Sequence, residues 1–332
     1  MQPEVLFEEY REGVLECLHY GTACVVDEHG VVASVGDPEW LSFYRSASKP
    51  IQALPVLVRG LHKKYGLTEE ETAIFSGSHW GDEDHVRVCE AILEKTGLKE
   101  EDMCMLPTYP NRPARKEALL RANMPPRRIY HNCAGKHLAL MLLARELGEN
   151  VSDYWKRESK TQAVVKEMVA YMSDTPADDI AIGVDGCGVP VFAVPFWRIG
   201  QAYLKLACPE LIDDPAVRQA VEENMVRLHA YPNMIAGKDV VDTIITARDG
   251  MIAKSGAMGV YAIGCREKRV GIVFKTADGS HDEFAASAIE AFIQLGIDPD
   301  LVEEIRKFYP DTIVNDNKFI VGNRKAVFKL VK

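Results

Sequence analysis

The chain has 332 residues, of which 47% are hydrophobic and 27% are charged, and its formal net charge is -10 at pH 7. This length and hydrophobic content allow one large domain, or two closely joined subdomains, with a substantial core. The acidic balance argues against a general nucleic-acid binder, because nucleic acids are usually held by clustered lysines and arginines. We therefore expect a small-molecule partner and no nucleic acid.

The N-terminal segment and the cysteines predict a cytoplasmic protein without membrane association. Residues 1–21 carry acids early and lack the basic segment and apolar run of a signal peptide. No stretch approaches the roughly 20 consecutive apolar residues that a membrane-spanning helix requires. Eight cysteines without a secretion signal are expected to be reduced thiols or metal ligands rather than a disulfide framework.

The first predicted element is a β-hairpin, and a largely helical region follows it. Residues 22–37 alternate in polarity, with a turn at 27–30 between two valine-rich runs. A helix begins near Ser46, and from about 52 to 178 the spacing of apolar residues is mostly helical. The clearest helical segments are residues 68–79, 82–98, 135–149 and 151–174.

The second half of the chain returns to mixed structure. Residues 179–195 read as a short apolar strand followed by a glycine-rich turn, and residues 239–250 as a helix ended by Gly250. Two strands, at 251–265 and 269–279, are joined by a charged turn. A further helix over residues 281–296 comes after them.

Strands at both ends of the chain thus enclose a helical insertion. This order predicts an α+β fold, in which helices pack on an antiparallel sheet, together with a helical subdomain. We expect residues 1–332 to form a single catalytic unit. Its sheet subdomain is expected at about 1–50 and 180–332, and its helical subdomain at 51–179.

Ser46 and Lys49 stand one turn apart at the start of the expected helix. A serine hydroxyl becomes a nucleophile when a base removes its proton, and a lysine can be that base if its pKa is lowered. The i, i+3 spacing puts both side chains on one helix face. The structural alternative makes Ser46 an N-cap and Lys49 a solvated first-turn residue, and the local sequence alone favours it.

A second lysine motif shifts the balance toward catalysis. Lys254-Ser255-Gly256 lies in a strand-like run before an expected edge turn, and penicillin-recognising enzymes combine Ser-x-x-Lys with a strand-borne Lys-[Ser/Thr]-Gly triad. Lys95-Thr96-Gly97 matches the same pattern, but it ends an amphipathic helix whose glycine is explained as a C-cap. We therefore expect Lys254 to act together with Ser46 and Lys49.

Ser76-Gly77-Ser78-His79 ends an apolar segment where small residues allow a close approach of the backbone. The two hydroxyls are able to relay protons or to bind a substrate carboxylate. The alternative is an ordinary turn before a helix capped by Asp82. His79 is either a pH-sensitive acid or base, or a structural histidine.

Cys133 and Cys187 are candidate metal ligands. Cys133 precedes a helix, so the helix dipole and Lys136 favour its thiolate, and Cys187 is flanked by glycines that let the backbone bend. Zinc is the natural ion for thiolates, although the spacing by itself is no zinc signature. Two alternatives stay open: buried small hydrophobic side chains, and a cysteine nucleophile assisted by His131 or His137.

Five motifs in the same order resemble the asparaginase II family, the Rhizobium-type L-asparaginases, over roughly residues 5–330. They are YRSASKP, SGSHWGDEDH, HNCAGKHLALM, GVDGCGVPVFAVP and AKSGAMGVYAIG. The resemblance implies a fold similar to serine β-lactamases and glutaminases, hydrolysis of L-asparagine to L-aspartate and ammonia, and a homodimer.

Matched position by position, the resemblance assigns roles to particular residues. It implies Ser46 as the nucleophile, Lys49 as its activating base and Ser78 as a second reacting hydroxyl. Lys254 corresponds to the strand lysine that supports charge and proton movement. The residues placed around the substrate are Arg45, His79 and Asp185.

The resemblance also implies a zinc site. Cys133, Lys136 and Cys187 correspond to its ligands, with the lysine as a neutral amine and water completing the coordination. With a serine nucleophile, such an ion would position substrate or shape the pocket rather than activate the attacking water. The chain departs from the family at Ala134, where members often have serine, and at Ser255, which replaces threonine.

Other functions use the same residues. A glutaminase differs by one substrate methylene, which is worth only about 1 to 3 kcal/mol in discrimination. A β-lactam or peptide acyl hydrolase would use the same serine and lysine, and turnover of a chromogenic cephalosporin would reveal it. A metal- or amino-acid-binding protein on a decayed enzyme scaffold would bind asparagine without turnover.

Overall fold

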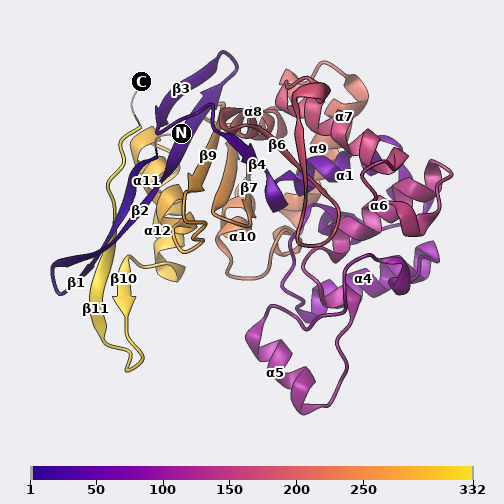
Figure 1. The fold of residues 1–332 in the computed structure, drawn as a ribbon, viewed down its shortest axis with the longest axis horizontal. Coiled ribbons are helices and arrows are strands. Elements are labelled where there is room, and N and C mark those ends of the chain that lie inside the picture. Colours follow the sequence, from indigo (N-terminus) through magenta and orange to yellow (C-terminus); the bar gives the residue numbers. More distant parts are fainter. Residues whose placement is uncertain (1–2, 331–332) are drawn as a thin grey trace. The chain divides into compact units, whose positions relative to one another are not determined.

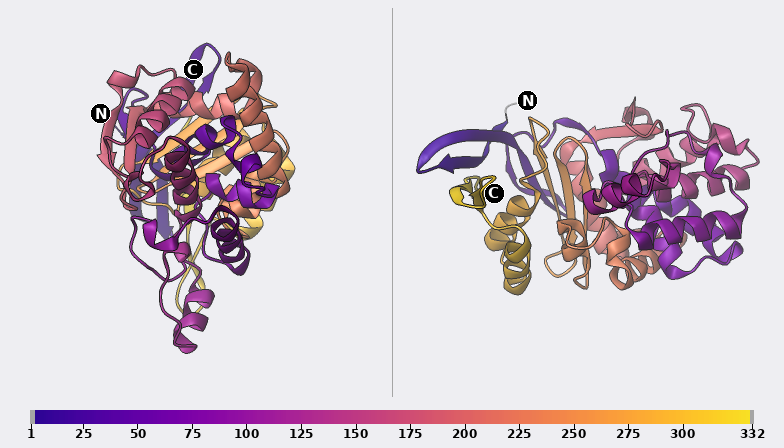
Figure 2. Two further views of the ribbon diagram at one scale, coloured as in Figure 1. Left: turned by 90° about the vertical axis from the view of Figure 1, so that its right-hand side faces the viewer. Right: turned by 90° about the horizontal axis from the view of Figure 1, so that it is seen from below.

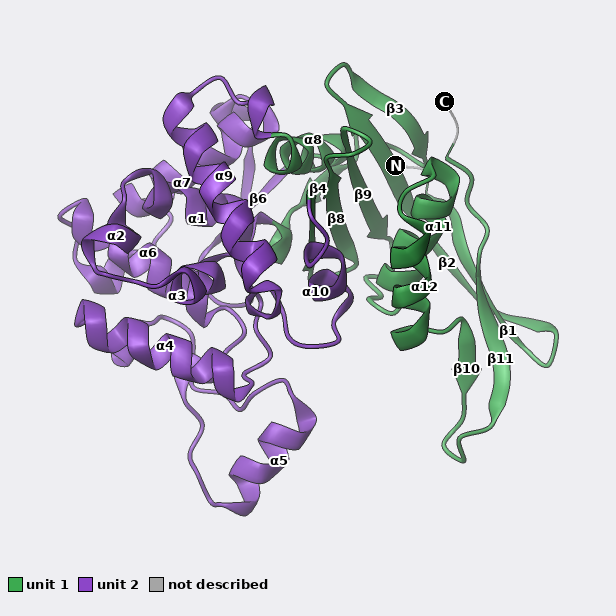
Figure 3. Cartoon of the chain, turned by 180° about the vertical axis from the view of Figure 1, so that it is seen from behind, with its two compact units in different colours: residues 1–47, 194–208, 250–332 green, residues 48–193, 209–249 purple. Residues whose placement is uncertain are grey.

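The computed structural model describes residues 3–330, which fall into two compact units (Figure 3). Unit 1 contains three separate stretches of the chain and unit 2 contains two. The stretches of unit 1 are Met1–Ala47, Val194–Cys208 and Gly250–Lys332, and those of unit 2 are Ser48–Ala193 and Pro209–Asp249.

An antiparallel sheet forms the body of unit 1 (Figure 1). Its strand order is β10-β11-β1-β2-β9-β8-β7, with β3 also paired to β2, and the neighbouring strands run antiparallel. This sheet confirms the α+β prediction. Its strands are β1 (Glu4–Arg11), β2 (Val14–Asp27), β3 (Gly30–Val35), β7 (Met251–Gly256), β8 (Val260–Cys265), β9 (Val270–Thr276), β10 (Thr312–Val314) and β11 (Ile320–Ala326); the short β4 (Leu41–Phe43) also lies in unit 1.

Helices cover both faces of this sheet. Tyr261 of β8 stacks on Phe284 of α11 (Phe284–Leu295), whereas a Cβ at Gly264 would overlap the carbonyl oxygen of Tyr203 in α8 (Phe196–Ala207). Residues 261 and 264 of one strand point to opposite faces, so α8 and α11 lie on opposite sides of the sheet. Helix α12 (Pro299–Phe308) packs against α11, as the yellow helices of Figures 1 and 2 show.

The hairpin expected over residues 22–37 is confirmed by β2 and β3, which meet at a turn between Asp27 and Gly30. The single strand expected over residues 251–265 is wrong, because two strands, β7 and β8, occupy that range. Between them Met258 and Gly259 have φ values of 62° and 77°. Nothing in the local sequence indicates that a methionine adopts this left-handed conformation.

Unit 2 is built from helices around α6. Helix α6 is rich in apolar residues and buried along nearly its whole length, as expected for a central helix, although Lys136 and His137 lie within it. It packs against α1, α4 and α7. The helices of unit 2 are α1 (Lys49–Val58), α2 (Leu61–Lys64), α3 (Glu69–Ala73), α4 (Glu83–Thr96), α5 (Pro113–Arg121), α6 (Ala134–Glu146), α7 (Lys160–Ser173), α9 (Pro215–Ala230) and α10 (Val241–Thr246).

Two further features of unit 2 bear on the sequence-based expectations. Strand β5 (Ala181–Val184) pairs antiparallel with β6 (Pro190–Pro195), and the expected glycine-rich turn connects them. Residues 209–249 belong to unit 2 rather than to the sheet subdomain in which we expected them, because α9 packs against α1 and α3.

The long helix expected over residues 151–174 is shorter in the structure. Only α7 is α-helical, because Ser159 caps its first turn by accepting a hydrogen bond from the backbone N–H of Gln162. No helix within residues 3–330 combines the length and the apolar character needed to cross a membrane.

Candidate active site

Lys49 is the first residue of α1 and is fully buried. A 3₁₀ turn, η1 (Arg45–Ser48), precedes it, and Ser48 rather than Ser46 occupies the N-cap. The structural alternative is therefore wrong on both counts, since Ser46 is not the cap and Lys49 is not solvated. A long cationic side chain is seldom placed in a protein interior unless polar groups receive it.

Ser78 and Asn132 both accept hydrogen bonds from the Lys49 amine. Its Nζ donates to Ser78 Oγ at 2.7 Å and to the backbone oxygen of Asn132 at 3.2 Å. Ser78 as a residue is half-buried, whereas Lys49 is fully buried. At this distance the amine and the hydroxyl are able to exchange a proton directly.

Gly77 positions the serine. A Cβ at Gly77 would overlap the backbone oxygen of Met234, so only glycine lets the segment run this close to residues 234–236. The backbone N–H of Ser78 then donates to Ile235 O at 2.8 Å, and that of Trp80 donates to Ala236 O at 3.1 Å. The segment is extended, not the ordinary turn of the alternative, although Asp82 does cap α4 as expected.

A second glycine brings the other acceptor of the amine into place. A Cβ at Gly135, in the first turn of α6, would overlap the backbone oxygen of Ile74. The close approach that glycine permits sets the start of α6 against η2 (Ile74–Ser76), the 3₁₀ turn that leads to Ser78. The Lys49 amine therefore bridges Ser78 and Asn132 because two glycines let their segments meet.

His79 has the surroundings of a structural histidine. It is fully buried, its Nδ1 accepts the backbone N–H of Gly81 at 3.1 Å, and its Nε2 lies 4.0 Å from Cys89 Sγ. Its ring stacks on His85 with centroids 5.2 Å apart. Burial, followed by the effects of His85 and Lys49, holds the pKa of His79 well below its usual range. The imidazole is thus kept neutral.

The three expected zinc ligands meet in a buried cluster of unit 2. Lys136 Nζ donates to Cys187 Sγ at 3.1 Å and lies 3.6 Å from Asp185 Oδ2. Cys133 Sγ donates to Asn132 Oδ1 at 3.4 Å, and the side chains of Cys133 and Cys187 are close enough to shift each other's pKa. We call Cys133, Lys136 and Cys187 the thiol–amine cluster.

The two sulfurs of this cluster share their protons unequally. The neighbouring Cys187 side chain holds the pKa of Cys133 well below its usual range in spite of burial, and Lys49 and Lys136 act in the same direction. The neighbouring Cys133 side chain and burial raise the pKa of Cys187. Burial opposes the charge on Lys136, but the nearby Cys187 and Cys133 sulfurs raise its pKa more strongly. The cluster therefore holds a thiolate beside an ammonium group.

Groups that the sequence analysis did not identify support the Cys187 turn. Cys104 Sγ donates to Cys187 O at 3.2 Å, and the backbone N–H of Cys104 donates to the hydroxyl of Tyr154 at 3.0 Å. That hydroxyl lies 2.5 Å from Nδ1 of His137. Of the two histidines weighed as partners of Cys133, His137 is thus engaged with Tyr154, whereas His131 Nδ1 accepts the backbone N–H of Cys133 at 3.1 Å.

The expected residues of unit 1 lie where β7 meets the turn that carries Ser46. A Cβ at Gly256 would come within 2.7 Å of Tyr44 O and 3.3 Å of Ala47 N, so this end of β7 touches residues 44–47. Lys254 is two residues before Gly256 and therefore shares its face of the strand. It is fully buried, and its Nζ donates to Ser255 O at 2.8 Å and to Ser255 Oγ at 3.3 Å.

The backbone next to Ser46 is strained. Arg45 has a φ of 50°, in the left-handed region that arginine seldom adopts. The hydroxyl of Tyr203 donates to Ala47 O at 2.7 Å and helps to hold the turn in this conformation. Such outliers persist where surrounding structure imposes them, and they often occur at functional sites. The sequence gives no sign of this strain.

The two Lys-[Ser/Thr]-Gly motifs lie in the secondary structure that we expected, one on a strand and the other at the end of a helix. Lys254-Ser255-Gly256 lies on β7, which is the last strand at one edge of the sheet. Gly97, in the competing Lys95-Thr96-Gly97, is a left-handed C-cap of α4 with a φ of 65°. Arg45, Ser46 and Lys254 are grouped in unit 1, and Lys49, Ser78, Asp185 and the thiol–amine cluster are grouped in unit 2.

Comparison with known proteins connects this arrangement to a family. The family model described as L-asparaginase II matches residues 7–326. No curated protein sequence matches the chain.

Solved structures give weaker similarities. A β-lactamase from Sulfitobacter sp. EE-36 is 15% identical with a TM-score of 0.43, covering 86% of this chain and 93% of its own. A class C β-lactamase from Rhodobacter sphaeroides is 16% identical with a TM-score of 0.42, covering 82% of this chain and 93% of its own. Simvastatin synthase (LOVD) from Aspergillus terreus is 11% identical with a TM-score of 0.38, covering 87% and 88%. With TM-scores below 0.5, these alignments support no conclusion about activity.

Proposed function

Because the chain belongs to the L-asparaginase II family, we propose that it hydrolyses the side-chain amide of L-asparagine to L-aspartate and ammonia. The family makes the chain an amidohydrolase. The observation that carries the proposal is the buried Lys49 amine, held 2.7 Å from the hydroxyl of Ser78. A decayed binding scaffold has no need to keep an amine and a hydroxyl together in its interior, where burying polar groups costs stability.

The proposed reaction proceeds through an acyl-enzyme on Ser46. Its hydroxyl oxygen attacks the side-chain amide carbon, the C–N bond of the tetrahedral intermediate breaks, and the nitrogen leaves as ammonia with an added proton. Water then cleaves the ester and releases L-aspartate. Backbone N–H groups around Ser46, or near the glycines that follow Lys254, would stabilise the oxyanion.

Lys49 and Ser78 would move the protons of this reaction. Lys49 would act as the neutral amine: it accepts the proton that Ser46 loses and exchanges protons with Ser78, and the proton reaches the leaving ammonia from this pair. Lys254 supplies positive charge from the strand whose end touches the Ser46 turn. Arg45 and Asp185 remain the residues proposed to surround the substrate, whereas the expected substrate role of His79 is replaced by a structural one because its ring is fully buried.

The thiol–amine cluster has the donors for a zinc ion. Two thiolates and a neutral amine are donors that suit zinc. Two ligands of a tetrahedral zinc are expected about 3.5 Å apart. Lys136 Nζ and Cys187 Sγ are 3.1 Å apart, so these two atoms would have to separate slightly to bind the ion. We propose that these three residues bind zinc, with release of the proton shared by the sulfurs and of one proton from Lys136. The ion would fix the shape of the pocket, while Asp185 and Cys104 hold the ligands in position.

Parallel assays with several substrates distinguish the proposed L-asparaginase activity from the alternative functions. Ammonia release from L-asparagine and from L-glutamine is measured side by side, with and without a chelator. Faster turnover of asparagine supports the proposal, and faster turnover of glutamine assigns a glutaminase. Hydrolysis of a chromogenic cephalosporin without ammonia release would assign a β-lactam hydrolase, and asparagine binding without turnover would assign a binding protein.

The proposed homodimer rests on the family resemblance, and light scattering of the purified protein tests it.

A further inference from the structure

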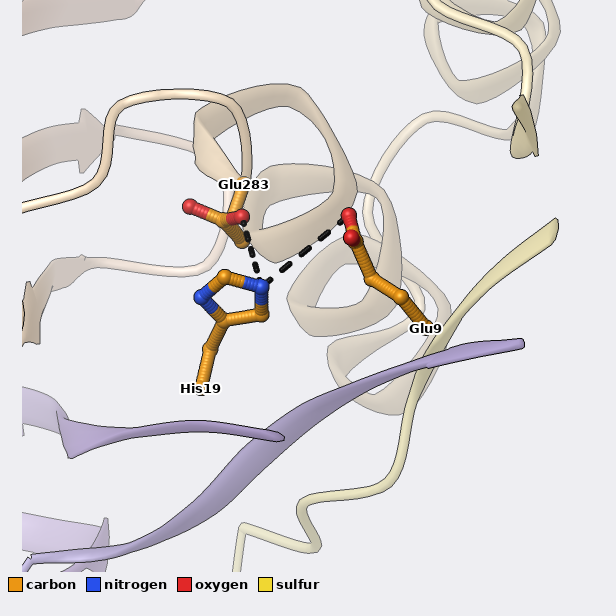
Figure 4. A group of neighbouring side chains, drawn as sticks. All are labelled: Glu9, His19 and Glu283. Atoms are coloured by element: carbon orange, nitrogen blue, oxygen red, sulfur yellow. Dashed lines mark ion pairs between the residues drawn. The ribbon is translucent and has the colours of Figure 1, made fainter. Parts of the chain in front are cut away.

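A second group of potential metal ligands lies in unit 1. Glu9 of β1, His19 of β2 and Glu283, at the start of α11, each offer one ligand atom, and these atoms all lie within 4.8 Å of one another. Figure 4 shows both carboxylates directed at the same ring nitrogen of His19. The distances from His19 Nε2 are 3.6 Å to Glu283 Oε1 and 4.0 Å to Glu9 Oε1.

The sheet register brings the first two ligands together. His19 lies opposite Phe7, and Phe7 and Glu9 share a face of β1, so the histidine and Glu9 are diagonal neighbours on one face. Register shifts interrupt the pairing between Val5 and Phe7 and again between Glu9 and Tyr10. Such bulges re-aim side chains and are common beside functional sites.

Glu283 is the feature that points to a missing partner. It is only 1% exposed, and within residues 3–330 neither of its carboxylate oxygens has a hydrogen-bond donor. The Nε2 atom of His19 is likewise buried without a hydrogen-bond partner. A buried carboxylate without donors is costly, whereas coordination to a cation satisfies it.

The neighbouring groups prepare His19 to be a ligand. Its other nitrogen, Nδ1, lies 2.8 Å from Asp278 Oδ2. In metal sites a carboxylate at this position fixes the tautomer of a ligating histidine and turns its Nε2 toward the ion. The carboxylate and the histidine are therefore placed as in a carboxylate–histidine–metal arrangement.

The charges of the group leave room for a divalent cation. Arg324 donates to Glu9 Oε1 at 2.6 and 2.8 Å, and its Nε lies 3.9 Å from Glu283 Oε1. With ionised carboxylates and a neutral imidazole, Glu9, Asp278 and Glu283 contribute three negative charges and Arg324 one positive charge. The net charge of the group is then about −2. Arg324 thus neutralises part of the acidic charge but does not reach a hydrogen-bonding distance from Glu283.

We propose that Glu9, His19 and Glu283 bind a divalent first-row transition-metal ion, with Asp278 positioning the histidine. One imidazole and two carboxylates suit zinc, cobalt or manganese and contrast with the thiolate donors of the other unit. Ligands about 2.1 Å from such an ion lie roughly 3 to 4 Å apart, so small side-chain movements complete the site. The ion ties β1, β2 and α11 together, and this role does not depend on the proposed reaction.

Cobalt binding to a Cys133→Ser/Cys187→Ser double variant tests the proposal without interference from the thiol–amine cluster. The metal-stripped protein should bind one equivalent of Co²⁺ with visible d–d absorption and no thiolate charge-transfer band. Adding Glu283→Gln should abolish saturable binding, and Asp278→Asn should weaken it about 10- to 100-fold. Glu16→Gln, on the exposed part of β2 and paired with Arg11, is the matched control and should bind as before.

Thermal unfolding of the wild-type chain supplies a second readout. In metal-free buffer Glu283→Gln should unfold at the same temperature as the wild type or a higher one, because it removes a buried unsatisfied charge. Added Mn²⁺, which prefers oxygen and nitrogen ligands to thiolates, should raise the unfolding temperature of the wild type and not that of the variant. A lower unfolding temperature of Glu283→Gln in metal-free buffer, with no Mn²⁺ effect on the wild type, would make the group an ion-pair network and overturn the proposal. Co²⁺ binding that survives Glu283→Gln would overturn it equally.

Discussion

Replacing Ser78 by alanine tests whether the buried lysine works through this hydroxyl. The change removes the 2.7 Å acceptor of the Lys49 amine, while Asn132 O at 3.2 Å stays in place. Loss of one buried hydrogen-bond partner typically costs about 1 to 3 kcal/mol in the free energy of unfolding. General acid–base catalysis by a positioned group contributes about 10²- to 10⁴-fold, so kcat should fall by that factor while KM changes little.

Ser76→Ala is the matched control for this experiment. Ser76 is a buried serine two residues away, and its hydroxyl accepts from Asn224 at 3.2 Å rather than from the lysine. It should lose a similar amount of stability in denaturant unfolding but little activity. Ammonia release is followed in a coupled assay for both variants. If Ser78→Ala keeps kcat within a few-fold of Ser76→Ala, the proton-exchange role of the Lys49–Ser78 contact is refuted.

Three further changes test other parts of the account. Gly256→Ala should reduce kcat at least about 10²-fold, because the alanine Cβ would come within 2.7 Å of Tyr44 O and displace the Ser46 turn. Retained activity, with a crystal structure that shows the turn unchanged, would contradict this prediction. His79 has a depressed pKa in the folded state, so below pH 6.5 the unfolded chain binds more protons than the folded chain. The free energy of unfolding is therefore retained above that pH and falls as the pH drops. The loss due to this histidine is at most about 1.4 kcal/mol per pH unit. Urea unfolding between pH 5 and 7 should show a shallower acid loss in His79→Asn, and an equal slope would show that His79 is not responsible. Cys187→Ser should lower the zinc content of the purified protein, measured by elemental analysis, and an unchanged content would remove the thiol–amine cluster as the zinc site.

Several elements follow from local sequence rules alone. The hairpin of β2 and β3, the helix α6 and the left-handed Gly97 at the end of α4 carry their signals within a few residues, as alternation, apolar spacing and a glycine C-cap. The position of Lys254 on a strand also agrees with its local pattern. These features depend on neighbours in the chain, and so the sequence predicts them well.

Other elements depend on contacts that no local pattern encodes. The turn at Met258 divides an apolar run into two strands, and only the paired backbone reveals it. Strand β11 has no buried residue and was not expected, because β1 supplies its pairing from the opposite end of the chain. The stretch that forms α9 was expected in the sheet subdomain, yet α1, against which α9 packs, lies more than 150 residues earlier.

The candidate site shows the same division. The residue types and their roles can be inferred from motifs, whereas the contact between Lys49 and Ser78 depends on Gly77 and Gly135 approaching remote backbone oxygens. The metal ligands proposed in unit 1 show no motif at all. Glu9 and Glu283 come from opposite ends of the chain, and sheet pairing and the start of α11 bring them together.

Acid-quenched intact-mass analysis during turnover of L-asparagine tests the serine acyl-enzyme most directly. The account predicts a transient mass increase of one aspartyl group that maps to the peptide containing Ser46, and both the adduct and ammonia release should be lost in a folded Ser46→Ala variant. Full ammonia release by Ser46→Ala, together with an inactive Cys133→Ala, would instead assign the chemistry to the thiol and contradict the proposed mechanism.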